Sequence, residues 1–282
     1  MARCRGRVLW LVMGNEPRLD IDAYLRRIGY EGSREPSAET LRDLQVAHLR
    51  TVPFENLSIH SAEPILLRDD ALFEKVITRR RGGFCYELNG LFAALLRALG
   101  FDVEMLAAGV AGASGTFGPE FDHMTLLVKL DERWIADVGF GDSFLEPLRL
   151  DEPKEQLQGA RAYKFVAEGD HRILWQRNYD GVWSKQYRFS LQPHVYAHYA
   201  ETCRFHQTSP DSHFTKGRVC TRATADGRVT LSELRLITTN NKGERQERTL
   251  ASENEYAAAL REHFGIALTR EFVRPVNQLE SS

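Results

Sequence analysis

The segment Arg81-Gly82-Gly83-Phe84-Cys85-Tyr86-Glu87-Leu88-Asn89 contains a cysteine at the point where a glycine turn meets a helical pattern. Apolar side chains recur after it at helical spacing, as far as a glycine that can end a helix: Leu88, Leu91, Phe92, Leu95, Leu96 and Leu99, then Gly100. The first turn of a helix has free N–H groups and the positive end of the helix dipole. We therefore predict that this position lowers the pKa of Cys85 from about 8.5 and favours the thiolate. The alternative is a small core residue, because free cysteines are often buried.

Two strands downstream contain candidate partners for this cysteine. The residue pattern predicts strands over 121–130 and 133–138, with Asp137 inside an apolar stretch where aspartate is a poor strand former. A Cys-His-Asp triad explains its presence: His123 takes the thiol proton, and Asp137 fixes the tautomer and orientation of the imidazole. Alternatively, His123 is an ordinary strand histidine and Asp137 caps the glycine-rich turn that follows.

The hairpin between these strands must put both side chains on one face. Side chains alternate faces along a strand, and a two-residue loop would turn Asp137 away from His123. A three-residue connection pairs Lys129 with Arg133 and Asp137 with Thr125, which shares a face with His123. We therefore predict an odd-length loop or a bulge between the strands.

Five segments, in order along the chain, resemble the arylamine N-acetyltransferase family. They are TVPFENL (51–57), RGGFCYELN (81–89), FDHMTLLV (121–128), ADVGFGD (136–142) and SPDSHF (209–214). The resemblance extends from about residue 19 to about residue 268, nearly the whole chain. It implies that Cys85, His123 and Asp137 are nucleophile, base and orienting acid, and that acetyl-CoA is the acyl donor.

The element pattern predicts an α+β fold with a cysteine-protease-like triad core. We expect an N-terminal extension (1–18), a helical domain with the nucleophile (19–100), a β-barrel-like domain with the histidine and aspartate (101–205) and an α/β lid (206–282). Asp20 and Ser37 are predicted helix caps, and Asp69 or Asp70 begins a third helix. Further strands are expected over 102–106, 161–166, 173–176, 183–191, 214–219 and 228–237, and a helix over 252–264.

Aromatic residues near the motifs are candidates for an acceptor pocket. Phe54, Phe84, Phe140 and Phe144 could line a flat aromatic site, or they could equally belong to the core.

A glycine-rich stretch over 109–118 is the candidate for contact with CoA. It lacks Gly-Lys-Ser/Thr and is therefore not a P-loop, but its exposed N–H groups could bind a phosphate. The alternative is a flexible connection before the His123 strand. With the resemblance, the predicted cofactor-binding residues are Gly115, Thr116, Phe117, Thr208 and Ser212.

The composition excludes several classes of protein. The chain has 282 residues, 43% hydrophobic and 27% charged, with a net charge of −2, which gives no general electrostatic reason to bind nucleic acid or a membrane. Its four cysteines form no CxxC pair, which favours a reducing cytoplasm.

His194 and His198 lack the partners of a zinc site, so no metal is expected. An apolar run of six residues, 8–13, follows three arginines but is short for a signal peptide.

The leading hypothesis is acetyl transfer from acetyl-CoA through acetyl-Cys85 to small arylamines, arylhydroxylamines or arylhydrazines, the chemistry of xenobiotic metabolism. One alternative is an amide synthase of the same family acting on a carrier-bound acyl chain. Another is a papain-like or transglutaminase-like enzyme with the same triad. A binding domain that has lost activity is disfavoured because all three triad residue types are present.

Overall fold

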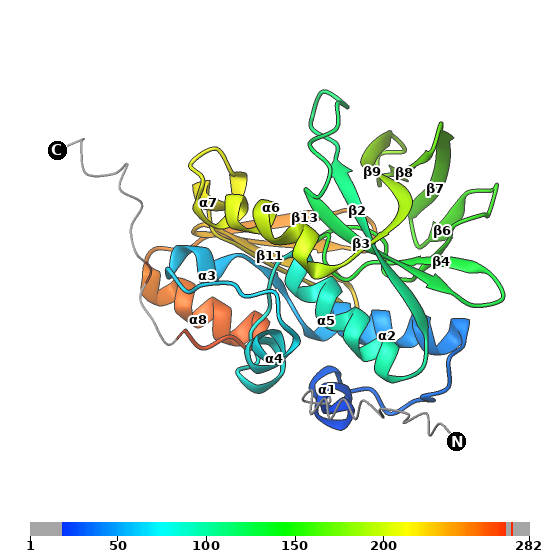
Figure 1. The fold of residues 1–282 in the computed structure, drawn as a ribbon. Coiled ribbons are helices and arrows are strands. Elements are labelled where there is room, and N and C mark those ends of the chain that lie inside the picture. The colour runs from blue at the N-terminus through cyan, green and yellow to red at the C-terminus, as the bar shows by residue number, and fades with distance from the viewer. Residues whose placement is uncertain (1–18, 269–271, 273–282) are drawn as a thin grey trace, which may run out of the picture.

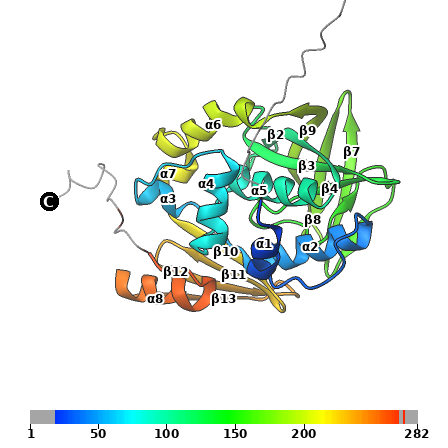
Figure 2. The same ribbon diagram turned by 60° about the horizontal axis from the view of Figure 1, so that its bottom comes forward.

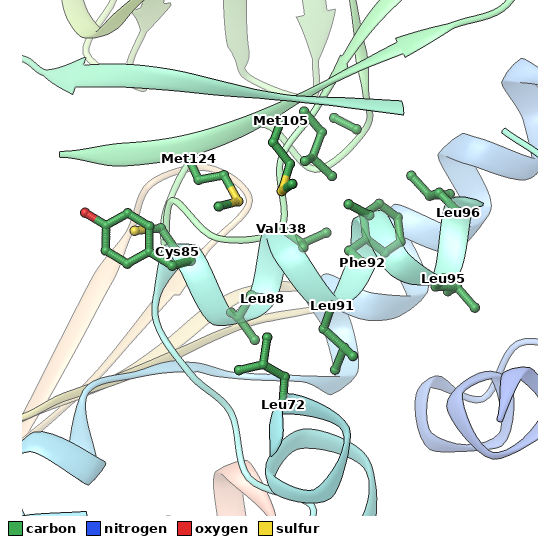
Figure 3. Close-up of a cluster of buried hydrophobic side chains, with 14 of the residues drawn as sticks. Leu72, Cys85, Leu88, Leu91, Phe92, Leu95, Leu96, Met105, Met124 and Val138 are labelled. Atoms are coloured by element: carbon green, nitrogen blue, oxygen red, sulfur yellow. The ribbon is translucent and has the colours of Figure 1, made fainter. Parts of the chain in front are cut away.

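The computed structural model describes residues 19–268 and residue 272, so the expected extension over 1–18 lies outside the described residues. Helix α5 (Cys85–Ala98) lies at the centre of the molecule (Figure 1). Every residue from Cys85 to Ala93 is buried. The apolar spacing predicted this helix, and it packs between the strands that follow it and the helices that precede it (Figure 3).

The N-terminal helices begin where their caps were predicted. Asp20 accepts from the Ala23 N–H at 2.9 Å, and Ser37 accepts from Thr40 at 3.1 Å. The helices before α5 are α1 (Ile21–Ile28), α2 (Ala38–Thr51), α3 (Leu57–His60) and α4 (Asp69–Phe73). The third predicted helix differs in its second half, where α4 continues as a π-helical turn, η1 (Glu74–Thr78). This turn contains Lys75, which forms a buried ion pair with Glu87 of α5.

An antiparallel sheet of eight strands follows α5, in the order β5-β4-β3-β2-β9-β8-β7-β6. The strands are β2 (Asp102–Val110), β3 (His123–Lys129), β4 (Arg133–Ala136), β5 (Leu148–Arg149), β6 (Gln156–Gln158), β7 (Arg161–Glu168), β8 (His171–Arg177) and β9 (Trp183–His194). Together with the helices, this sheet confirms the α+β class.

The two edge strands of this sheet are joined through a side chain. Gln156 Oε1 accepts from the Arg149 N–H at 2.8 Å, and Gln156 Nε2 donates to the Arg149 carbonyl at 2.9 Å. The amide thus pairs with β5 as a neighbouring peptide unit would, and the sheet is nearly closed into a barrel.

The β3–β4 hairpin has the predicted odd-length loop. Lys129 pairs with Arg133, which leaves a three-residue connection between the strands. The register continues through Leu126 and Ala136, so the next position sets Asp137 opposite Thr125. His123 and Asp137 therefore share a face, and the prediction is confirmed.

A second antiparallel sheet, β1-β10-β11-β12-β13, begins with a strand from the N-terminal part of the chain. Its strands are β1 (Phe54–Glu55), β10 (Val219–Thr224), β11 (Gly227–Ser232), β12 (Arg235–Asn240) and β13 (Arg245–Thr249). Helix α8 (Glu253–Phe264) packs against it through Tyr256, Leu260 and Phe264 (Figure 2). The helix predicted over 252–264 is confirmed.

Two predicted strands are wrong. The stretch 214–219 begins instead as helix α7 (His213–Lys216), because the Ser212 hydroxyl caps it by accepting from the Phe214 N–H at 3.2 Å. The stretch 228–237 is a hairpin, with Ser232 paired to Arg235 and Glu233 at a φ of 47°. Helix α6 (Tyr196–Thr208), which precedes α7, was not predicted.

Candidate active site

Cys85 is the first residue of α5, and its side chain is enclosed by the folded chain. The residue is only 3% exposed. Glu87 holds the helix start: one carboxylate oxygen accepts from the Phe84 N–H at 3.0 Å, and the other lies 2.6 Å from Lys75 Nζ. These contacts fix the backbone that carries the sulfur.

The predicted lowering of the Cys85 pKa is wrong for the free protein. Burial raises the pKa of the Cys85 thiol well above its ordinary value, and the negative charge of Asp137 adds to the effect. A hydrogen bond from the Met124 backbone N–H acts in the opposite direction but is the weaker influence. The helix start does not compensate for the removal of the thiolate from water.

His123 and Asp137 form a buried pair at the end of the β3–β4 hairpin. His123 Nε2 lies 2.7 Å from Asp137 Oδ2. Burial disfavours the carboxylate, but His123 and hydrogen bonds from Asn89 and Gly139 lower the pKa of Asp137 below its ordinary value. The pairing leaves Nδ1 as the imidazole nitrogen that can exchange a proton with another group.

Asn89 connects the cysteine helix to this pair. Its amide nitrogen donates to Asp137 Oδ1 at 2.8 Å and to the Met124 carbonyl, and its oxygen accepts from the Val138 N–H at 2.8 Å. Its position four residues after Cys85, on the same helix face, is the signal that could have identified it.

Gln45 of α2 is a second residue that the sequence did not single out. Its Oε1 accepts from the Asp137 N–H at 3.0 Å, across 92 positions in the chain. No local pattern around Gln45 points to this contact.

Gly139 allows the hairpin to approach α5. A Cβ atom there would lie 2.7 Å from Cys85 Cα and 2.9 Å from the Cys85 carbonyl oxygen. Real Cβ contacts are not this short, so the segment after Asp137 reaches the cysteine only with glycine at this position. Figure 3 shows Cys85 at the start of α5 beside Met124, the neighbour of His123 in sequence.

Two aromatic rings enclose His123. The rings of Phe140 and Tyr187 each lie with their centroids 5.1 Å from the imidazole centroid. Tyr187 is fully buried, and its hydroxyl lies 3.3 Å from the Thr125 hydroxyl. Burial and the charge of Asp137 raise the pKa of Tyr187. The imidazole therefore lies in a largely water-free aromatic site.

The four candidate phenylalanines lie in two groups. Phe140 and Phe144 line a cavity of about 300 Å³. Phe54 and Phe84 pack on Phe214, with ring centroids 6.1 and 5.5 Å from it. Phe84 is fully buried, so any contact it makes with a substrate requires movement of its neighbours.

The candidate cofactor-binding residues lie on separate elements. Gly115, Thr116 and Phe117 belong to the connection between β2 and β3, and Gly115 has a φ of 76°. Thr208 ends α6 and is exposed, whereas Ser212 caps α7, is buried and lies 3.1 Å from His206 Nδ1. The CoA role of these five residues stays a prediction.

The described part of the chain has neither a cluster of metal ligands nor a helix that could span a membrane. Among residues 19–268 and 272, no three or more histidine, cysteine, aspartate and glutamate residues gather as a metal site would require. Within the same residues, no helix has the length and apolar character needed to cross a membrane.

Comparison with known proteins supplies the family. A family model described as N-acetyltransferase matches residues 37–273. The chain is 34% identical to an arylamine N-acetyltransferase of Escherichia coli K12, over 88% of this chain and 89% of that protein. It is 35% identical to proansamycin X synthase of Amycolatopsis mediterranei, over 85% and 94% respectively. A solved structure of Mycobacterium marinum arylamine N-acetyltransferase in complex with CoA matches with a TM-score of 0.82 and 31% identity, covering 88% of this chain and 93% of that one. The chain belongs to the arylamine N-acetyltransferase family.

Proposed function

We propose that this protein transfers the acetyl group of acetyl-CoA to the nitrogen of an arylamine, or to an arylhydroxylamine or arylhydrazine, through an acetyl-cysteine at residue 85. The observation that carries the proposal is the buried His123–Asp137 pair beside the start of α5. Membership of the family and the CoA complex of the M. marinum relative support acetyl-CoA as the donor.

The first half-reaction acetylates the enzyme. The Cys85 sulfur attacks the thioester carbonyl while its proton passes to Nδ1 of His123. The tetrahedral intermediate collapses, the C–S bond to CoA breaks, and the proton returns to the departing CoA sulfur. Asp137 holds Nε2 and stabilises the imidazolium that forms between these steps.

The second half-reaction reverses these roles. The amine nitrogen attacks the acetyl-cysteine carbonyl and loses a proton to His123. The Cys85 sulfur leaves as the amide forms, and it recovers the proton from the imidazolium. The high thiol pKa means that attack and proton transfer are coupled at neutral pH, because a free thiolate is a minor species there.

Incubation with acetyl-CoA alone tests the mechanism. Mass spectrometry of the purified protein should reveal a single acetyl adduct, and peptide mapping should assign it to Cys85. Addition of an arylamine should then remove the adduct and yield the N-acetylated amine. The matched control is Cys85→Ala, which should stay folded, bind no acetyl group and show no turnover. An adduct confined to Cys203 or Cys220 would contradict the assignment.

An amide synthase is the second candidate, favoured by the identity to proansamycin X synthase. An acyl chain bound to a carrier would then replace acetyl-CoA as the donor. Acetylation of Cys85 by acetyl-CoA at low concentration, with turnover on simple arylamines, favours the acetyltransferase. Acylation only by a long-chain thioester favours the synthase.

A cytoplasmic location is part of the same proposal. Cys85, Cys203 and Cys220 are all free and buried, which suits a reducing compartment. A free nucleophilic thiol and a supply of acetyl-CoA are both needed for the reaction.

A further inference from the structure

The cavity that contains Phe140 extends from the triad toward the second sheet. It has a volume of about 300 Å³, and its walls come from the end of α2, the segment after β4, the start of β7, and the turns that join β10 to β11 and β12 to β13. Asp137 and Phe140 belong to its lining, and the Phe140 ring packs edge-on against His123, with the ring centroids 5.1 Å apart. A ligand in this cavity would contact the lining residues Asp137 and Phe140, whereas Cys85 and His123 are not part of the lining.

Two arginines in the cavity share one carboxylate. Arg161 Nη1 lies 2.7 Å from Asp142 Oδ1, its Nη2 lies 3.2 Å from Oδ2, and Arg228 Nε lies 3.0 Å from Oδ1. The arginine side chains are only 13% and 14% exposed, whereas Asp142 is about half exposed. Bulk water therefore screens the charge of neither guanidinium group well.

The cavity is lined by three arginines and three carboxylates, one of which is enclosed away from the space. Arg50 is a third arginine on the wall, and the acids facing the same space are Asp142 and Glu146. The Asp137 carboxylate also borders the cavity, but it is fully buried and held by His123. Arg161 Nε is buried and has no hydrogen-bond partner. Arg228 Nη1 donates to Thr221 Oγ1 at 3.0 Å, so Asp142 and Thr221 together engage only part of the two guanidinium groups.

Aromatic rings complete the binding surface. The Arg161 guanidinium lies over the ring of Tyr179, 4.6 Å from its centroid, and Phe140 and Phe144 form an apolar wall. A stacked guanidinium has a fixed plane and binds carboxylate or phosphate through paired hydrogen bonds. The surface combines a flat apolar region with a planar cation.

We propose that Arg161 and Arg228 form an anion subsite for a negatively charged group of a substrate, either the carboxylate of an acidic arylamine or a phosphate of CoA. This inference rests on the proposed acetyl transfer. Asp142 occupies the arginines in the free protein and competes with the ligand anion. Its removal should strengthen anion binding, and removal of Arg161 should weaken it.

Opposite effects of two neutralising variants test this subsite. Acetylation of 4-aminobenzoate and its uncharged methyl ester should be compared in Arg161→Gln, Asp142→Asn and the control Arg177→Gln, an arginine on β8 outside the cavity. Acetyl-CoA and acetyl-3′-dephospho-CoA form the second comparison. Within one of these pairs, the preference for the more anionic ligand should fall about tenfold in Arg161→Gln, equivalent to about 1.4 kcal/mol, and rise in Asp142→Asn. It should not change in Arg177→Gln.

The pair of ligands whose relative preference changes in the variants identifies the source of the anion. A change in the aminobenzoate preference assigns the carboxylate of the acceptor, and a change in the CoA preference assigns a phosphate. If neither preference moves, or if both variants shift it in the same direction, the arginines only join the two sheets and the subsite is refuted.

A binding measurement separates this result from failure of the acetyl transfer itself. Calorimetric titration of Cys85→Ala with benzoate and with adenosine 3′,5′-bisphosphate reports the subsite without turnover. Weaker binding in Cys85→Ala/Arg161→Gln supports it, and equal binding overturns it. Absence of an acetyl adduct on wild-type Cys85 would instead count against the proposed function.

Discussion

The side-chain amide of Asn89 donates to Asp137 Oδ1 at 2.8 Å, so the helix that carries Cys85 also holds the carboxylate that pairs with His123. The proposed nucleophile lies on α5, and the proposed base and orienting acid lie on the β3–β4 hairpin. One amide fixes their separation, because it contacts both the aspartate and the strand that contains the histidine.

Replacement of Asn89 should slow acetylation of Cys85. We expect Asn89→Ala to reduce its rate by about 10²-fold, the effect of about 1 Å of misalignment between reacting groups. Asn89→Asp should be slower still, because it sets a second buried carboxylate beside Asp137. The measurement is single-turnover acetylation followed by mass spectrometry. Asn178→Ala, in the β8–β9 turn, is the control. Equal rates for all variants would show that Asn89 has only a packing role.

The carboxylate of Asp137 should be essential for rate and less important for binding. Asp137→Asn keeps the shape of the side chain but favours the wrong imidazole tautomer, a change that costs about 10⁴-fold in a serine triad. We expect kcat to fall by several orders of magnitude with a small change in KM. Asp170→Asn, at an exposed turn, is the matched control. Near-normal activity of a folded Asp137→Asn protein would assign this residue to the turn alone.

The pH dependence of Cys85 alkylation follows from its burial. Since the pKa of the thiol lies well above its ordinary value, the thiolate fraction increases throughout the neutral and mildly alkaline range. The rate of modification by iodoacetamide, followed by peptide mapping of Cys85, should therefore keep rising beyond pH 9. A plateau near pH 7 would mean that Cys85 and His123 exist as an ion pair in the free enzyme.

His48 should make the fold sensitive to acid. Its side chain is fully buried, lies 2.8 Å from the Tyr24 hydroxyl, and has its pKa lowered by burial to about 3. Below about pH 6.5 His48 is protonated in the unfolded chain, whereas in the folded chain it stays neutral down to about pH 3. Stability from this group is therefore present above pH 6.5 and is lost as the pH falls, by about 1.4 kcal/mol per unit.

Urea unfolding of wild type and His48→Gln at two pH values measures this effect. Glutamine can accept from Tyr24 but does not titrate. The difference in unfolding free energy between the two proteins should narrow by about 2 kcal/mol between pH 6.5 and pH 5. A difference that stays constant with pH would contradict the assignment to His48.

The parts of the fold that the sequence predicted depend on local patterns. Helix α5 has regular apolar spacing, the caps at Asp20 and Ser37 act over one helical turn, and the hairpin register follows from the alternation of side chains. The position of the Cys85 helix and the pairing of His123 with Asp137 were therefore predicted correctly.

The incorrect predictions concern features that depend on contacts between residues far apart in the sequence, or on an unusual turn residue. Gln45 binds a residue 92 positions away, and the pKa of Cys85 is set by surrounding elements rather than by its own helix. The β11–β12 turn has no glycine, and Glu233 adopts the positive φ that the turn requires. Without the usual turn residue, two short strands have the pattern of one long strand.

The Gln156 amide has a consequence for the behaviour of the protein at high concentration. Strand edges with free N–H and C=O groups can recruit a second chain and begin an intermolecular sheet. Here the Arg149 N–H and carbonyl are already engaged within the same molecule. The point where the sheet nearly closes therefore offers little template for aggregation, and the strands there, only two and three residues long, reduce that template further.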